Sequence, residues 1–111
     1  MSSSLTTLVP TLNGASNYQE WAALMKSFLQ SQGKWRLMNR VRPTKVKDRQ
    51  EIPSEESDAW DDNNDQAIGS IRLRLSPNIA FQYRSTETAY ALWEGLEKQY
   101  GDSGQIGRAH V

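Results

Sequence analysis

Aromatic and aliphatic residues recur every three or four positions in the stretch NYQEWAALMKSFLQSQGKW, residues 17–35. The residues that share this spacing are Tyr18, Trp21, Leu24, Met25, Phe28 and Leu29. Such spacing places them on one face of an α-helix, here predicted over residues 18–32, with polar residues on the opposite face. Asn17 can cap the helix together with Glu20, and Gly33 suits the left-handed residue that ends one. A helix with so large an apolar face needs partners, so the rest of the chain must supply a helical core.

Two further helices are predicted before residue 76. Trp35, Leu37, Met38 and Val41 indicate a short helix that packs back on the first. A longer helix can begin at Ser54 or Ser57. Its helical stripe consists of Trp60, Ala67, Ile68, Ile71 and Leu75. Acidic residues gather at its start and two arginines at its end, as the helix dipole favours.

Two more helices are predicted after residue 75. Ser76-Pro77 can begin a short helix, because proline is tolerated at the first helical position. Thr86 can cap the last helix, which Gly101 ends. The apolar stripe of that helix is Ala89, Leu92, Trp93, Leu96 and Tyr100.

The expected fold is all-α: a small bundle of three main helices and two short ones, since no stretch shows sustained period-2 alternation. Residues 42–53 are polar and contain two prolines, so they are predicted to form a loop. The predicted structural core comprises Tyr18, Trp21, Leu24, Met25, Phe28, Trp35, Trp60, Ile68, Ile71, Leu92, Trp93 and Leu96.

The predicted domain organisation is a flexible N-terminal arm (1–11), one helical domain (12–101) and a disordered tail (102–111). The hydroxyl-rich start, broken by Pro10, favours the arm. The last six residues, IGRAHV, read like the translation of a common sequencing adapter. We therefore expect 106–111 to be non-biological, which would make the chain an N-terminal fragment, and we assign no role to His110, the only histidine.

Composition excludes several classes of function. Thirteen basic and thirteen acidic residues give a formal net charge of zero, so there is no global attraction to nucleic acid or to an anionic membrane. The chain has no cysteine, which excludes disulfides and zinc knuckles within it. No segment has the ~20 apolar residues that a membrane span requires. We expect a cytoplasmic protein without a membrane partner.

A basic segment, residues 34–49, is the nearest approach to a nucleic-acid patch. Its candidates for a weak contact with RNA phosphates are Arg36, Arg40, Arg42, Lys45 and Lys47. Few aromatic residues interleave with them, and an acidic run follows directly, so a solvated loop is the favoured interpretation. Likewise, the four tryptophans could stack on bases, but their helical spacing favours core packing.

No catalytic or metal site is predicted, and no cofactor. The acidic cluster after residue 50 lacks the order of a calcium loop and suits a helix start. Asp102-Ser103-Gly104 matches the triplet of retroviral-type aspartic proteases, but it lacks the apolar strands that such a triplet needs on both sides. We interpret it as a loop and expect no enzyme.

The residues between Leu8 and Gly101 resemble the N-terminal pattern of Gag polyproteins from copia-type LTR retrotransposons. The resemblance is carried by Leu12-Asn13-Gly14, Asn17-Tyr18, Trp21, Met25, Leu29 and Trp35; by Trp60, Asp65, Ala67, Ile68, Ile71 and Leu75; and by Thr88-Ala89, Leu92-Trp93, Leu96 and Tyr100.

This resemblance implies the N-terminal, helical lobe of a capsid protein. Its implied function is structural: copies of Gag associate with one another into virus-like particles that package RNA. In that family the RNA-binding zinc knuckle and the enzymes lie further along the polyprotein, so neither is carried over to this chain. The alternative hypothesis is an RNA-binding adaptor that uses residues 34–49.

Overall fold

The computed structural model describes residues 8–39 and 41–101, except for the side chain of Asn39. Its helices are α2 (Tyr18–Ser31), α3 (Glu55–Arg72), α4 (Pro77–Gln82) and α5 (Ala89–Leu96). Short 3-10 helices span Ala15–Asn17 and Trp35–Asn39, and a π-helical turn, Glu97–Gly101, continues α5. Strands β1 (Lys45–Lys47) and β2 (Gln50–Ile52) form a hairpin. The prediction of a mainly helical fold with three main helices is confirmed.

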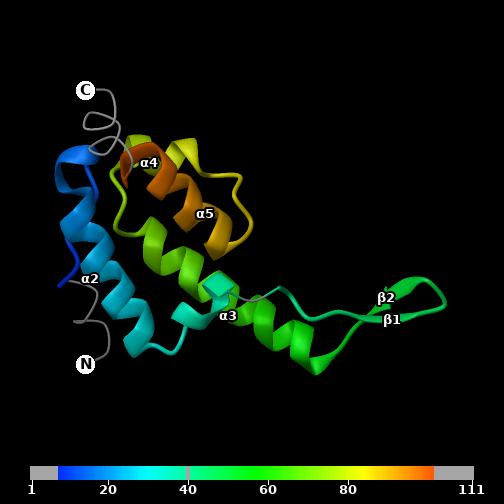
Figure 1. Ribbon diagram of the computed structural model, residues 1–111. Helices are drawn as coiled ribbons and strands as arrows, with labels where there is room; N and C mark the ends of the chain where they lie inside the picture. The colour runs from blue at the N-terminus through cyan, green and yellow to red at the C-terminus, as the bar shows by residue number, and fades with distance from the viewer. Residues whose placement is uncertain (1–7, 40, 102–111) are drawn as a thin grey trace, which may run out of the picture.

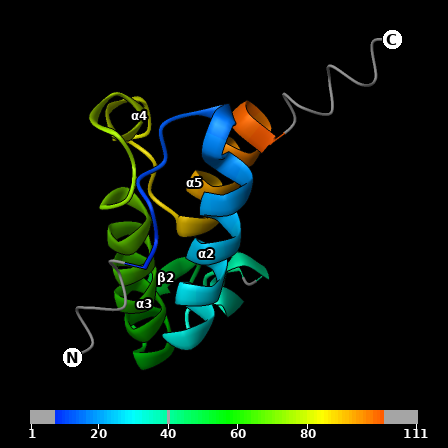
Figure 2. The ribbon, with the colours of Figure 1, turned by 90° about the vertical axis from the view of Figure 1, so that its left-hand side faces the viewer.

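Helices α2 and α3 run side by side in opposite directions, and α5 packs beside both (Figures 1 and 2). The short 3-10 helix Trp35–Asn39 closes the same core, contributing Leu37 and Met38. Helices α2, α3 and α5 each bury one apolar face, so the shared apolar interior holds the bundle together.

The N-terminal segment is built into this bundle at Leu12. The backbone N–H of Leu12 donates to the carbonyl oxygen of Arg74 at 2.7 Å, and that of Ser76 donates to the carbonyl oxygen of Leu12 at 3.0 Å. Val9 is only 1% exposed and lies in the core, although it belongs to the segment 1–11 expected to form an arm. The described core therefore begins before residue 12.

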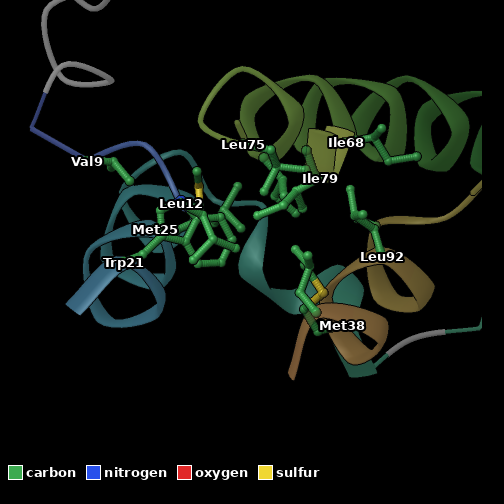
Figure 3. Close-up of a cluster of buried hydrophobic side chains, with 14 of the residues drawn as sticks. Val9, Leu12, Trp21, Met25, Met38, Ile68, Leu75, Ile79 and Leu92 are labelled. Carbon is green, nitrogen blue, oxygen red and sulfur yellow. The ribbon is translucent and has the colours of Figure 1, made fainter. Parts of the chain in front are cut away.

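Most of the predicted core residues lie in the interior, part of which Figure 3 shows. The buried ones are Tyr18, Trp21, Met25, Ile68, Ile71, Leu92 and Leu96, and those partly buried against them are Phe28, Trp35, Trp60 and Trp93. The prediction is wrong for Leu24, which is 37% exposed. Consecutive helix residues point about 100° apart. Because Met25 is fully buried, Leu24 falls at the solvent edge of the apolar face.

Three of the predicted helix boundaries are confirmed. Ser54 is the N-cap of α3, and its side-chain oxygen accepts a hydrogen bond from the backbone N–H of Ser57. Pro77 stands at the start of α4 after Ser76. Gly33, with φ of 72°, adopts the left-handed conformation just after α2, where a side chain would be strained.

Two predicted caps differ in the structure. Thr88, not Thr86, caps α5, its side-chain oxygen accepting from the backbone N–H of Ala91. Asn17 is the N-cap of α2, but its side chain makes no capping hydrogen bond. It instead accepts from the backbone N–H of Asn13 at 3.0 Å and donates to the carbonyl oxygen of Thr11 at 2.8 Å. Asn17 thereby fixes the turn before the helix rather than forming a capping box.

Candidate interaction surfaces

The segment 42–53, predicted to be a loop, contains the β-hairpin, which projects from the helices (Figure 1). Its register pairs Lys45 with Ile52 and Lys47 with Gln50. Between the strands, Asp48 and Arg49 have φ of 53° and 67°. Positive φ at both residues defines the tight turn whose twist matches two antiparallel strands. The strands are too short to show alternation in the sequence, which is why the hairpin was missed.

The hairpin presents positive charge to solvent. Side chains of a strand alternate between its two faces, so Lys45 and Lys47 share one face and Val46 lies on the other. All three are exposed. Neither lysine forms an ion pair within the described part of the chain. The two lysines are therefore available cations.

Arg42 differs from these lysines because it is already paired. Its Nε lies 2.8 Å from Oδ1 of Asp61 on α3, and its Nη1 contacts the carboxylate of Glu51 on β2. The hydrogen bond from Arg42 lowers the pKa of Asp61 below its ordinary value, and both carboxylates raise the pKa of Arg42. Arg42 thus joins the base of the hairpin to α3, and its charge is not free for a phosphate.

Among the described residues, Lys34 and Arg36 of the basic segment lie outside the hairpin. Arg36 is exposed on the 3-10 helix Trp35–Asn39. Arg40 lies outside the described residues. Lys34 donates to the carbonyl oxygen of Gln32 at 3.4 Å and to Oδ1 of Asn63 at 3.3 Å. The basic segment is thus divided among separate elements.

The outer face of α3 carries the opposite charge. We call this set the acidic stripe: Glu55, Asp58, Asp62 and Asp65. Successive members are three or four residues apart, so they line one side of the helix. All four are exposed and unpaired among the described residues. The stripe lies away from Ala67, Ile68 and Ile71, which face the core.

Three of the four tryptophans, Trp21, Trp35 and Trp93, form an aromatic cluster rather than an open platform. The rings of Trp21 and Trp93 stack with centroids 5.5 Å apart, and Trp35 meets Trp93 edge-on at 5.0 Å. Trp21 is fully buried, whereas Trp35 and Trp93 are partly buried and line a surface groove of about 410 Å³. Nζ of Lys26 lies 5.2 Å from the Trp35 ring centroid, over its face. The rings therefore serve mainly to join the helices.

A second groove, of about 680 Å³, runs between α3 and the loop that leads into α5. Two α3 side chains that the sequence did not single out for this role hold the loop. Asn64 donates to the carbonyl oxygen of Glu87 at 2.8 Å and accepts from the backbone N–H of Ala89 at 2.8 Å. Arg72 donates from Nη2 to the carbonyl oxygens of Tyr83, Arg84 and Thr86. Both side chains hold the loop against α3, since they form hydrogen bonds with its backbone groups.

Across residues 8–39 and 41–101, no cluster of potential metal ligands occurs. Within the same ranges, no helix combines the length and the apolar character needed to cross a membrane. The Asp102 triplet lies outside the described residues. Besides the grooves, the described surface offers the charged hairpin and the acidic stripe for interactions.

Residues 25–111 match the model of a family described as the gag-polypeptide of LTR copia-type. The chain belongs to this family. The resemblance noted in the sequence is thereby confirmed, and the Gag match covers the 3-10 helix, the hairpin and helices α3, α4 and α5. No curated protein and no solved structure matches the chain.

Proposed function

We propose that this Gag chain is a structural, non-catalytic protein whose copies associate into a particle-like shell in the cytoplasm. The observation that carries the proposal is the family match over residues 25–111. The helical fold is compatible with this function. A small helical unit with a buried aromatic core can present its outer surfaces to other copies without rearranging.

Association would work through many weak contacts. A neutral chain has little overall self-repulsion, and contacts between patches of opposite charge attract at short range. When several such contacts form in one closed assembly, each further contact is effectively intramolecular, so the total affinity greatly exceeds that of one contact.

Light scattering of purified, nuclease-treated protein over a wide range of concentrations tests the proposal. We expect the weight-average mass to rise with concentration and to fall again on dilution. The Trp21→Ala variant, which should be much less stable than the unmodified chain, serves as the control for non-specific aggregation. A monomeric mass at every concentration, both for this chain and for a C-terminally extended Gag chain, would contradict the proposal.

The second candidate function is RNA binding through the basic segment. The observation in its favour is that Lys45 and Lys47 are exposed and unpaired among the described residues. Against it, Arg42 is already held by two carboxylates and the cations are spread over separate elements. Filter binding at several salt concentrations separates the two functions. Each phosphate contact steepens the slope of log affinity against log salt by about 0.7 on a single strand, so a slope near zero rejects RNA binding.

A further inference from the structure

We propose that the β-hairpin of one copy docks on the acidic stripe of α3 in a second copy. The inference rests on the proposed function and names the surfaces through which the copies would meet. Lys45 and Lys47 supply the cations, and Asp58 and Asp62 the facing carboxylates. All four side chains are exposed.

The spacing of the two charge sets is complementary. Residues two apart on a strand lie on the same face about 6.8 Å from each other, which applies to Lys45 and Lys47. Residues four apart on a helix lie on the same side with a rise of about 6 Å, which applies to Asp58 and Asp62. A hairpin laid along α3 can therefore place both lysines against both aspartates at once.

The fold prevents this contact within one copy. Only two residues separate the end of β2 at Ile52 from the start of α3 at Glu55. Arg42 bridges β2 and α3 through Glu51 and Asp61, which holds the base of the hairpin in place. From that base the hairpin extends away from α3 (Figure 1). Its exposed lysines are therefore accessible to another molecule.

The contact joins two different patches, so each copy keeps one free hairpin and one free stripe. Contacts of this head-to-tail kind generate rings when the rotation between copies closes and open chains when it does not. The docking therefore extends an assembly beyond a dimer, as a shell requires.

Charge reversal tests the docking by light scattering at constant salt. Lys45→Glu with Lys47→Glu makes the hairpin acidic, and Asp58→Lys with Asp62→Lys makes the stripe basic. Either pair alone should raise the concentration for half-association by about tenfold or more, since like charges would then face one another. The exposed Lys98→Glu, in the π-helical turn that follows α5, is the matched control and should leave association unchanged.

Mixing provides the decisive measurement. An equimolar mixture of the two reversed proteins restores opposite charge at every contact, so association should return to the level of the unmodified chain. One chain carrying all four substitutions should also associate. Circular dichroism checks that each variant folds, and the neutral pair Asp58→Asn with Asp62→Asn replaces the lysine pair if the latter unfolds.

Two results would overturn the docking. One is association of the unmodified chain that neither reversed pair weakens, which leaves the proposed function intact but removes these surfaces from it. The other is association that depends on added RNA, is lost with the acidic hairpin and does not return on mixing, which would assign the lysines to RNA. If neither this chain nor the extended Gag chain associates at any concentration, the proposed function itself is contradicted.

Discussion

The indole Nε1 of Trp21 donates a hydrogen bond to the carbonyl oxygen of Arg74 at 3.0 Å, across 53 residues of sequence. The same oxygen accepts from the backbone N–H of Leu12. The carbonyl of Arg74, just after α3, therefore binds both α2 and the N-terminal segment through hydrogen bonds. The ring that makes this bond is itself fully buried and stacks on Trp93.

Replacing Trp21 should therefore be among the most damaging changes in the chain. We expect Trp21→Ala to lower the free energy of unfolding by about 3–5 kcal/mol, since it removes a large buried ring and leaves a cavity. Trp21→Phe keeps a ring but loses the hydrogen bond, and should cost less. Urea unfolding followed by circular dichroism measures both. Leu73→Ala, at a position 75% exposed, is the control and should change stability by less than about 0.5 kcal/mol.

Asn64 should contribute far more to the stability of the fold than its neighbour Asn63. Asn64→Ala leaves the buried N–H of Ala89 without its partner, at a cost of about 1–3 kcal/mol, and also removes the part-buried hydrogen bond to the carbonyl of Glu87. Asn63→Ala removes one exposed contact with Lys34 and should be nearly neutral. Thermal melts of the two variants test this difference. Equal melting temperatures would mean that the tie between α3 and α5 is dispensable.

Replacing two helical glycines, Gly95 and Gly69, by alanine should change the free energy of unfolding in opposite directions. A Cβ at Gly95 would stand 2.7 Å from Cε1 of Tyr83, so Gly95→Ala should destabilise by about 1–3 kcal/mol through overpacking. Nothing lies within 4 Å of a Cβ at Gly69 in α3, so Gly69→Ala should stabilise by up to about 1 kcal/mol. Urea unfolding distinguishes the two signs.

The clash with Tyr83 can be isolated in a double variant. In a Tyr83→Ala background the ring is gone, so adding Gly95→Ala should no longer destabilise the protein. If Gly95→Ala were equally harmful in both backgrounds, the tyrosine ring would not be its cause.

The ion pair of Arg42 and Asp61 predicts a defined pH dependence. The hydrogen bond from Arg42 depresses the pKa of Asp61 in the folded chain below its ordinary value near 3.8. A depressed carboxyl pKa stabilises the fold above the unfolded value, and this stabilisation is lost as pH falls through the folded value. Arg42→Gln should therefore be less stable than the parent chain at pH 6, and the difference should shrink as the pH falls below the ordinary carboxyl value of 3.8. Thermal melts from pH 2 to pH 7 measure it, with Arg36→Gln, which alters an exposed arginine, as the control.

Local patterns in the sequence were sufficient to predict the helices. Side chains at three- and four-residue spacing mark α2, α3 and α5, and Ser54, Pro77 and Gly33 stand at boundaries that the structure confirms. These features depend only on residues within a few positions of one another, so they can be read along the chain.

What the sequence could not supply depends on contacts between distant residues. Leu24 shares the helical stripe of α2, yet whether it is covered depends on how far the neighbouring helices reach around Met25. The partner of Trp21 is a backbone carbonyl, which has no signature in the sequence. The hairpin strands are three residues each, too short for a period, and their orientation depends on Arg42 meeting Asp61 on α3. The sequence alone thus determined the helices and the family, whereas tertiary packing decided which apolar residues are covered and where the charged surfaces face.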